Sequence, residues 1–437
     1  MSLRIKHFIT KDKEKTYYTI PFSVEEGVEQ ITVSYSYPDA TKGLLGDLHP
    51  VNTIDLGIMD ESGRFLGWSG SAKKEIFIGE YSSTKGYLSA PIKPGEWKII
   101  VGAYHVADSG VEVTYEIDFK KKERQLLYGD LHVHSEASDG KYDAFTLAGL
   151  AKKQGLDFIA LANHNNYSEN LNLPRVDNLT FIPAVEWTHY KGHMNFFGVP
   201  SPFENSFIAN NEAEAEKLVN NARARGAVIS VNHPKCRICP FLWENENFDM
   251  VEIWNGPMTP RNARAIAYWT KLLKEGRKIP AVGGSDYHKP LNPARLGNPV
   301  TAVISESRSS ADILDAVKKG RSFITSGVDG VKLLIKCSGS IMGESVRCGG
   351  RLLEISAENL RGESVVLVTN LGETVIKTHC FKKLETAVSL SRDTTFAYIK
   401  AVHLTGKAEH VRAITNPIYF EPYTDGGNLN EKQTESN

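Results

Sequence analysis

The sequence predicts an α/β domain built around seven strands, flanked on both sides by all-β, sandwich-like domains. Three observations predict this class. Residues 5–119 alternate polar with β-branched and aromatic residues, residues 125–323 alternate apolar runs with helical patterns, and the β alternation returns after Thr325. With 437 residues the chain exceeds the usual span of one hydrophobic core, so several domains are expected.

The N-terminal region, residues 1–125, consists of short runs of period two such as "EQITVSYSYP", "KEIFIGEY", "EWKIIVGAYHV" and "VEVTYEIDF". Gly, Pro, Asp and Ser turns separate these runs at intervals of roughly ten residues, which is typical of an all-β sandwich. The charged stretch "KKKER", from Lys120 to Arg124, is interpreted as a solvated linker to the next domain.

Residues 126–323 carry seven apolar runs, "LLYGDLHVHS", "DFIALANHN", "LTFIPAVEW", "HMNFFGV", "GAVISVNHP", "FDMVEIWNG" and "KIPAVGGSDYH". Amphipathic patterns at 143–155, 212–226 and 261–277 lie between them, and a further helix is expected over 310–323. Apolar strands that alternate with helices indicate a mainly parallel sheet, and seven of them suggest a barrel.

The C-terminal region, residues 324–425, is predicted to form a second sandwich-like β domain from runs such as "VKLLIKCSG", "LLEISAENL", "ESVVLVTNLG" and "TFAYIKAVHL". Residues 426–437 are polar and are expected to be a disordered tail.

Composition narrows the class of partner. The residues are 41% hydrophobic and 24% charged, as in folded proteins, and the net charge of -1 provides no basic field for a nucleic-acid polymer. The N-terminus lacks the apolar core of a signal peptide and no run is long enough to span a bilayer, so no membrane association and a cytoplasmic location are expected, although a removed leader would leave no trace. The oligomeric state is left open.

The five cysteines provide no disulfide framework, which fits a reducing compartment. Cys236 and Cys239 form a C-x-x-C just after His233, but the other cysteines supply no second close pair for a structural zinc site. A redox or metal role for this pair is the minor interpretation.

Histidines gather at the predicted strand ends. Seven of the thirteen lie between His132 and His288. His132 and His134 are two apart on a strand and therefore point to one face. Asp139 follows five residues later in a Ser/Gly-rich loop that could turn its carboxylate back over the strand end.

Later strands repeat this pattern, ending in His164, Glu186, His233 and the pair Asp286 and His288. A carboxylate that follows an apolar run is costly to bury unpaired, and a metal ion is a natural partner.

His193 opens the fourth strand and does not close it. Only six residues separate it from Glu186, too few for a parallel crossover. Strands three and four are therefore predicted to form an antiparallel hairpin, which would bring His193 to the end where the other candidates lie.

These nine side chains exceed the three or four that a single zinc ion uses. They therefore predict two or three divalent ions, with Glu186 or Asp286 as a shared, bridging and catalytic carboxylate. Imidazole and carboxylate suit zinc, iron or manganese. Asp130, two residues before His132, is better read as a residue behind the ligands than as a ligand, and Glu252 and Asn255 at the end of strand six could line the pocket or support ligands.

The motifs "GDLHVHSEASDG", "ANHN", "GHMNFFG", "NHP" and "GGSDYH" resemble the PHP (polymerase and histidinol phosphatase) metallohydrolases over roughly Leu127 to Phe323. The flanking β domains, "TSG" and "TNPIY" look like the CehA/McbA-type branch. The resemblance implies a distorted seven-stranded barrel. It implies three metal sites: His132, His134, Glu186 and Asp286; Glu186, His193 and His233; Asp139, His164 and His288. Asn163 stands where many relatives have Asp, which could alter the surroundings of the third site without removing a ligand.

Water held between two divalent ions supplies a bridging hydroxide near neutral pH. The favoured hypothesis is hydrolysis of a small phosphomonoester or phosphodiester by in-line attack of this hydroxide. Five cations near strand ends are candidate phosphate anchors, namely Lys235, Arg237, Arg261, Lys289 and Arg295. Two alternatives stay open: a carbamate, ester or amide hydrolase that uses the same site, and a non-catalytic binding protein stabilised by metal.

Overall fold

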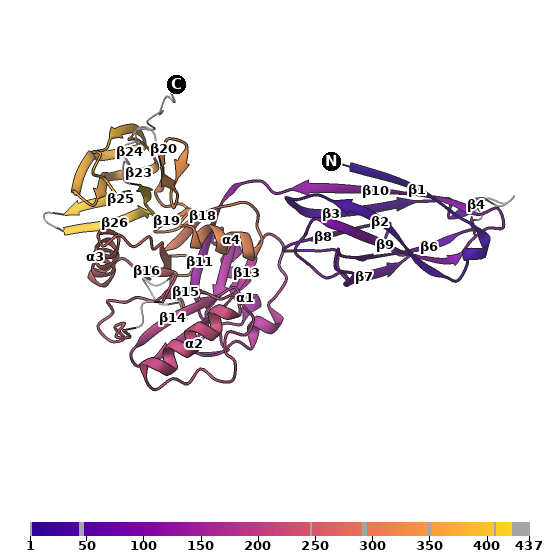
Figure 1. Cartoon of the computed structure of the whole chain (residues 1–437), viewed down its shortest axis with the longest axis horizontal. Coiled ribbons are helices and arrows are strands. Elements are labelled where there is room, and N and C mark those ends of the chain that lie inside the picture. The colour runs from indigo at the N-terminus through magenta and orange to yellow at the C-terminus, as the bar shows by residue number, and fades with distance from the viewer. Residues whose placement is uncertain are drawn as a thin grey trace, which may run out of the picture. The chain divides into compact units, whose positions relative to one another are not determined.

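The structure is a computed structural model that describes residues 2–42, 48–244, 247–290, 295–347, 351–405 and 408–421. The chain divides into two compact units, each seen in Figure 1. The first unit comprises Met1–Gln125 and Glu306–Ser309, and the second comprises Leu126–Ser305 and Ser310–Asn437. The predicted tail at 426–437 lies outside the described residues.

The first unit consists of strands, as its period-two pattern indicates. In its described part, two four-stranded antiparallel sheets have the orders β1-β10-β3-β8 and β2-β9-β6-β7, and β4 pairs with β5. The alternate apolar residues of both sheets form one buried cluster that includes Ile31, Ile58 and Trp97. The strands are β1 (Ser2–Ile9), β2 (Tyr17–Val24), β3 (Val28–Ser36), β4 (Ala40–Lys42), β5 (Leu48–Pro50), β6 (Thr53–Met59), β7 (Phe65–Gly70), β8 (Glu75–Gly79), β9 (Gly95–His105) and β10 (Val111–Lys121), with a 3-10 turn η1 (Lys11–Lys13).

The expected linker "KKKER" is partly wrong. Lys120 and Lys121 are the last residues of β10, and the Lys120 ammonium pairs with the Glu29 carboxylate of β3. The Lys122 Nζ lies 2.9 Å from Glu80 Oε1. Glu29 is only 3% exposed, and a buried carboxylate needs a cation beside it, which keeps Lys120 on the sheet.

Each of the seven apolar runs predicted in the second unit contains a strand. These are β11 (Gln125–Val133), β12 (Phe158–Leu161), β13 (Thr180–His189), β14 (Gly192–Phe197), β15 (Val228–Val231), β16 (Met250–Asn255) and β17 (Ala281–Gly284). Pairing is parallel from β11 to β13 and from β15 to β17, whereas β14 is antiparallel to both of its neighbours. The antiparallel hairpin predicted from the short spacing before His193 is confirmed.

The helices are few: α1 (Ala144–Lys153), α2 (Glu212–Ala224), α3 (Pro260–Lys274), α4 (Ser310–Lys318) and a 3-10 turn η2 (Glu169–Asn172). The helix predicted over 310–323 ends earlier. Gly320 adopts φ +73, the left-handed conformation that commonly terminates helices, and a strand follows at once. Among the described helices, none combines the length and the apolar character needed to cross a membrane.

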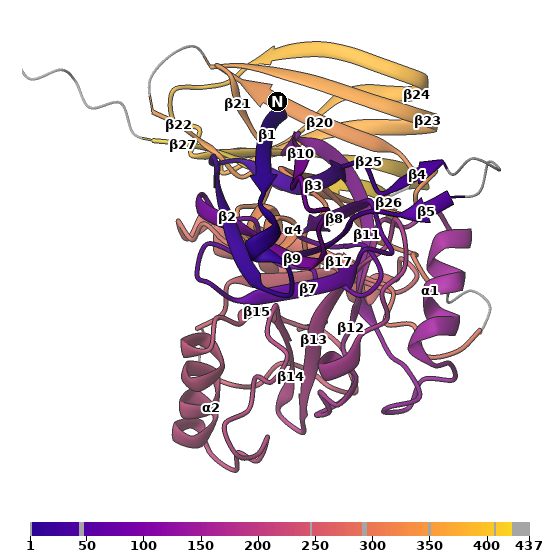
Figure 2. The ribbon, with the colours of Figure 1, turned by 90° about the vertical axis from the view of Figure 1, so that its right-hand side faces the viewer.

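The remaining strands belong to the same compact unit and continue its sheet. They are β18 (Val300–Ser305), β19 (Ser322–Thr325), β20 (Lys332–Cys337), β21 (Ser340–Ile341), β22 (Ser345–Val346), β23 (Leu352–Thr369), β24 (Gly372–Ser389), β25 (Phe396–Thr405), β26 (Ala408–Thr415) and β27 (Ile418–Phe420). The runs "LLEISAENL" and "ESVVLVTNLG" are largely one long strand, β23, which lies beside β24 (Figure 2). Irregularities in register around Asn359 and Gly362 keep this strand continuous where the sequence suggested a break.

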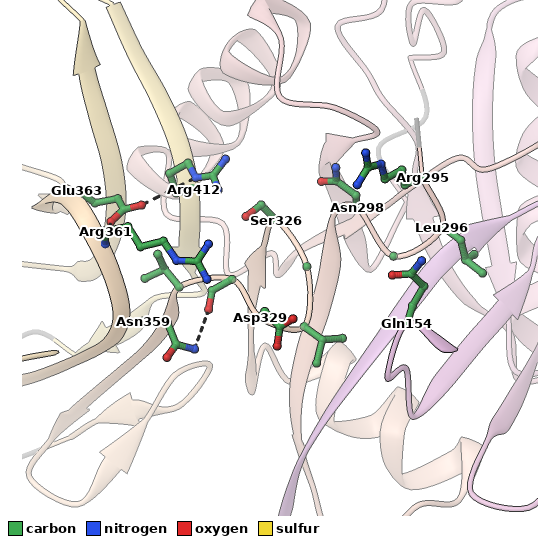
Figure 3. Close-up of a pocket in the computed structure, with 15 residues that line it drawn as sticks. Gln154, Arg295, Leu296, Asn298, Ser326, Asp329, Asn359, Arg361, Glu363 and Arg412 are labelled. Atoms are coloured by element: carbon green, nitrogen blue, oxygen red, sulfur yellow. Dashed lines mark hydrogen bonds and ion pairs between the residues drawn. The ribbon is translucent and has the colours of Figure 1, made fainter. Parts of the chain in front are cut away.

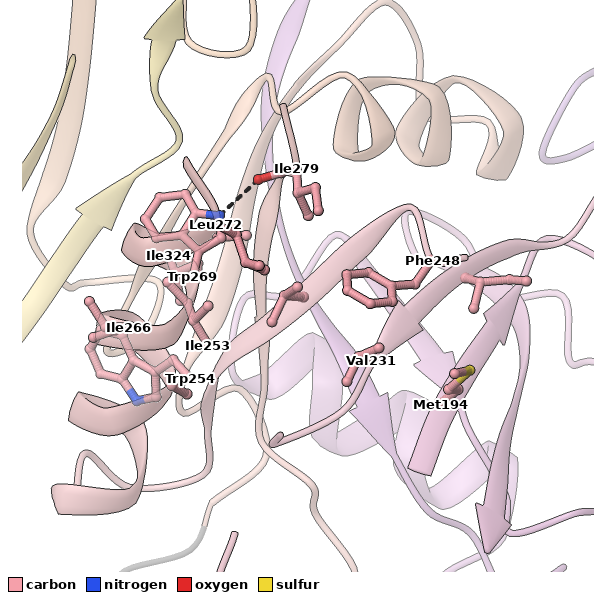
Figure 4. Close-up of a cluster of buried hydrophobic side chains, with 14 of the residues drawn as sticks. Met194, Val231, Phe248, Ile253, Trp254, Ile266, Trp269, Leu272, Ile279 and Ile324 are labelled. Atoms are coloured by element: carbon pink, nitrogen blue, oxygen red, sulfur yellow. Dashed lines mark hydrogen bonds between the residues drawn. The ribbon is translucent and has the colours of Figure 1, made fainter. Parts of the chain in front are cut away.

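A buried apolar cluster joins α3 to β16 and to the C-terminal strands (Figure 4). Trp269 of α3 is fully buried, and its indole Nε1 donates to the carbonyl of Ile279 at 2.8 Å. Its ring lies 4.9 Å from that of Tyr398 on β25, measured between centroids. The second unit is thus mixed α/β with much sheet, and its apolar contacts hold the strand ends that carry the candidate ligands.

Candidate metal centre

His132 and His134 emerge together at the end of β11. Both side chains are fully buried. Gly284 of β17 lies against His132, since a Cβ at this glycine would be 2.4 Å from His132 Cβ. The absence of a side chain at Gly284 therefore lets the first histidine pack against the neighbouring strand.

The loop after β11 returns to the strand end, as its Ser/Gly-rich composition indicated. The Gly140 amide donates to Ser135 O at 2.9 Å, and a Cβ at Gly140 would be 2.3 Å from His134 O. This tight turn places Asp139 Oδ1 3.5 Å from His164 Nε2 and 3.2 Å from His288 Nε2.

Backbone strain marks two of the candidate ligands. His233 has φ +30 and Asp286 has φ +52, both in the left-handed region that non-glycine residues rarely adopt. Such strain is commonly concentrated at functional sites, where the surrounding structure maintains it. Here it turns each side chain sharply as the chain leaves its strand.

Glu186 lies at the centre of the cluster and is 1% exposed. Its Oε1 is 3.4 Å from His132 Nε2, 3.1 Å from His193 Nδ1 and 3.4 Å from His233 Nε2. Its Oε2 is 3.5 Å from His134 Nε2 and 2.9 Å from His164 Nδ1. One carboxylate from β13 thus meets five imidazoles from four other segments of the chain, since His132 and His134 share the end of β11.

Asp286 adds a second carboxylate to this cluster. Its Oδ1 lies 3.5 Å from His132 Nε2, 3.1 Å from His134 Nε2 and 3.6 Å from His288 Nδ1. Thus all nine side chains predicted as ligands lie in one connected cluster.

Among the described residues, three groups of side chains in and beside this cluster have ligand atoms close enough together to hold an ion. They are His132, His134 and Asp286; His134, Asp139, His164 and His288; and His193, His233 and Cys239. These groups overlap the three predicted sets. His134 also joins the set of Asp139, His164 and His288, and Cys239 joins His193 and His233.

The donor set fits divalent metal. His132 Nε2, both ring nitrogens of His134 and Glu186 Oε2 are buried without a hydrogen-bond partner in the described structure. Leaving such atoms unsatisfied is expensive, and imidazole nitrogen with carboxylate oxygen is the ligand chemistry of zinc, iron and manganese. Coordination would satisfy these atoms together.

The electrostatics of the cluster are dominated by its carboxylates. Burial acts to lower the pKa of His132, but Glu252, Glu186 and Asp286 outweigh it and raise that pKa well above the usual value. Burial likewise acts against ionisation of Glu186, yet the surrounding histidines hold its pKa well below the usual range. Positive charge, carried by protons or metal ions, is therefore favoured here.

Glu252 supports two of the histidines from behind. Its Oε1 lies 2.9 Å from His132 Nδ1, and its Oε2 accepts from the His233 amide at 3.0 Å and from Asn255 Nδ2 at 3.1 Å. A carboxylate on Nδ1 leaves the Nε2 atom of His132 to face Glu186, the arrangement that orients metal-bound histidines in many proteins.

Asp130 also lies behind the ligands, as its spacing predicted. Its Oδ1 accepts from the amides of His132 at 3.2 Å and Ser285 at 2.8 Å, and its Oδ2 accepts from that of Gly297 at 2.8 Å. Burial raises the pKa of Asp130 to about 6, although these hydrogen bonds oppose the shift.

Asn163, where the PHP resemblance leads one to expect Asp, is also buried behind the site. Its Oδ1 accepts from the Ser135 amide at 2.9 Å and its Nδ2 donates to Glu169 Oε2 at 3.0 Å. Asn163 therefore fixes the loop that carries Asp139.

The five predicted phosphate anchors are dispersed. Arg261 Nη2 donates to Asn255 Oδ1 at 2.6 Å, and Lys235 Nζ lies 4.1 Å from the centroid of the Tyr268 ring. Arg237 and Lys289 are exposed. Arg295 lines a separate cavity with two other arginines, a grouping that sequence spacing did not indicate.

Two polar residues of the site, Asn232 and Thr188, were missed, and Cys239 had been given a metal role only as the minor interpretation. Asn232 Nδ2 donates to Glu186 Oε1 at 2.9 Å, Thr188 Oγ1 lies 2.6 Å from His164 Nδ1, and Cys239 Sγ lies 3.6 Å from His233 Nδ1. Asn232 and Thr188 are one and two residues from predicted ligands, a proximity that could have signalled them. The position of Cys239 depends on a loop whose path spacing does not determine.

A cavity of about 580 Å³ adjoins the cluster through His193 and Cys239. Its other lining residues include Tyr190, Phe207, Ile208 and Ile238, and none of the described residues that line it is Lys or Arg. This lining suits an apolar or aromatic group next to the candidate metals.

Comparison with known proteins gives distant structural similarity. Neither a family model nor a curated protein sequence matches the chain. A two-domain protein from Bacteroides vulgatus, with a predicted PHP-like metal-dependent phosphoesterase, is 17% identical, with a TM-score of 0.40 over 67% of this chain and 95% of that one. An amidohydrolase from Chromobacterium violaceum, solved with bound sulfate and no metal, is 13% identical, with a TM-score of 0.28 over 38% of this chain and 89% of that one.

Proposed function

We propose that the chain is a metal-dependent hydrolase of small phosphomonoesters or phosphodiesters, with its site in a distorted seven-stranded PHP-type barrel. The observation that carries the proposal is the position of Glu186, a buried carboxylate within 3.5 Å of five histidine rings. A merely structural role would not require so many titratable groups to be buried together. The PHP resemblance of the sequence motifs points to the same activity.

Two or three divalent ions, zinc, manganese or iron, would be held by the nine clustered side chains, with Glu186 shared between them. When bound, such ions supply a water of lowered pKa as nucleophile and stabilise negative charge that develops on the scissile group. Glu252 fixes His132 from behind, and Asn163 fixes the loop of Asp139. Asp286, whose Oδ1 lies 3.6 Å from His288 Nδ1, is proposed together with Glu186 as a catalytic carboxylate that would hold and orient the ions.

The substrate body would occupy the cavity beside His193. Arg237 and Lys289 are exposed and follow ligand motifs in the chain, so they are proposed to attract the phosphate. Lys235, Arg261 and Arg295 are weaker candidates for this role, since Lys235 stacks on Tyr268, Arg261 is bound to Asn255 and Arg295 lines another cavity.

Hydrolysis of a carbamate, ester or amide is the second candidate. The observation that favours it is the lining of the same cavity, where Tyr190, Phe207 and Ile238 contribute and no described lining residue is cationic. A neutral aryl substrate would be accommodated there more readily than a charged phosphate.

The test is elemental analysis of the purified full chain, followed by assay with zinc, manganese or iron added back. Phosphomonoesters, phosphodiesters and aryl carbamates are compared. The variant His132→Ala/His134→Ala should lose its metal, and its turnover should fall at least hundredfold. The control His379→Ala, which changes an exposed histidine on β24, should match the native chain. Carbamate turnover without phosphoester turnover would replace the first candidate with the second. Bound metal with no turnover of any substrate would reject both.

A further inference from the structure

A second cavity, of about 250 Å³, lies within the second unit and is lined by side chains from separate segments (Figure 3). Arg295 and Asn298 come from the loop before β18, Ser326 from the turn after β19, Arg361 from β23 and Arg412 from β26. The lining includes none of the nine candidate metal ligands.

Three arginines line this cavity, and their guanidinium groups have few partners. Within the described ranges, the guanidinium groups of Arg295 and Arg361 make no hydrogen bond or ion pair. Arg412 Nε is buried without a hydrogen bond, and it forms a long ion pair with Glu363 Oε1 at 3.9 Å. A buried guanidinium nitrogen without an acceptor is costly, so a ligand that supplies one would be favoured.

The carboxylates of the lining do not neutralise these arginines fully. Glu363 is 1% exposed, and its Oε1 lies 3.2 Å from His403 Nε2 while its Oε2 accepts from the Arg361 amide. Asp329 is exposed and also lines the cavity. Three arginines against two carboxylates leave an excess of one positive charge, in a chain whose net charge is -1.

The backbone around the cavity is held in place. The Ser326 amide donates to Arg412 O at 3.3 Å, and Asn359 Nδ2 donates to Gly330 O at 3.2 Å. The Gly330 amide closes a turn onto Gly327 O at 2.9 Å. A lining ordered before the ligand arrives loses less entropy on binding.

We propose that this cavity is a binding site for a small phosphorylated molecule, recognised by Arg295, Arg361 and Arg412. A phosphate group presents oxygens in several directions and can accept from guanidinium groups that approach from different segments, whereas a planar carboxylate suits one guanidinium fork. The site is separate from the metal centre and does not depend on the proposed hydrolase activity.

The test is calorimetric titration of the full chain with inorganic pyrophosphate at low ionic strength. Arg295→Gln and Arg361→Gln change exposed side chains, so both variants should fold, and each should weaken binding at least tenfold through loss of charge-assisted hydrogen bonds. Arg64→Gln is the matched control, because it removes the same charge from an exposed position in the first unit. Its affinity should stay within twofold of the native value.

Two further arms locate the site and identify its chemistry. His132→Ala/His134→Ala should retain pyrophosphate binding, since the lining excludes the metal centre. Loss of binding in this variant, or unchanged binding in both arginine variants, would overturn the proposal. Malonate should bind more weakly than pyrophosphate, and equal or tighter binding of malonate would overturn the assignment to phosphate.

Discussion

The interior of the first unit and the centre of the candidate metal site in the second are both buried, but the first contains apolar side chains and the second contains charged ones. In the first unit, Ile31, Ile99 and Trp97 are fully buried in a cluster of apolar side chains. In the second, Glu186 and Glu252 are 1% and 2% exposed among histidines. Apolar burial stabilises a fold directly, whereas buried charges cost free energy unless they are paired. The first interior therefore stabilises its fold by itself, whereas the charges of the second need partners.

Removing the largest apolar side chain of the first interior should have the largest effect on folding. Trp97→Ala deletes a fully buried indole and leaves a cavity, which is expected to cost about 3–5 kcal/mol in the free energy of unfolding of the first unit. Urea unfolding of the full chain followed by circular dichroism measures this loss.

The matched control is Tyr104→Ala on the same strand, where the side chain is 68% exposed and the change should be within about 0.5 kcal/mol. Metal content should be native in both variants. A fall in metal content with Trp97→Ala would mean that the two interiors are not independent.

Changing the central carboxylate of the second interior should act on chemistry. Glu186→Gln keeps the size of the side chain but removes the charge shared by five imidazoles, so metal content should fall and turnover should drop about hundredfold or more, equivalent to about 2.7 kcal/mol. Elemental analysis and the assay of the reconstituted chain measure both. Glu136→Gln, at an exposed position in the adjacent loop, is the control and should match the native chain. Native metal content in Glu186→Gln would contradict the proposed role.

A smaller effect on metal binding is expected from changing Glu252, which contacts candidate ligands but is not one of the nine candidate ligands itself. In Glu252→Gln the amide nitrogen would have to face either His132 Nδ1 or the donors His233 N and Asn255 Nδ2. Metal affinity should therefore weaken about 10–100-fold, as measured by competition with a chelator. The control, Glu216→Gln on the exposed face of α2, should leave metal affinity unchanged. Unchanged metal affinity in Glu252→Gln would contradict the supporting role of Glu252.

Much of the fold was predictable because local patterns determine it. The seven apolar runs between "LLYGDLHVHS" and "KIPAVGGSDYH" each contain a strand, and the six residues between Glu186 and His193 required the antiparallel hairpin. The failures occurred where a distant contact decides the local structure. Glu29 on β3 holds Lys120 on the sheet, and the expected linker became the end of a strand.

For the candidate site, the sequence alone determined which side chains stand at strand ends, because the period of a strand and the length of a connection are local properties. It could not show that Glu186 is the side chain that most of the histidines share, that Asn232 and Thr188 contact the same cluster, or that Arg295 lines one cavity with Arg361 and Arg412. Those facts were decided by tertiary structure, since sheet pairing and core packing bring distant segments together. Arg295 and Arg412, for example, are 117 residues apart in the sequence.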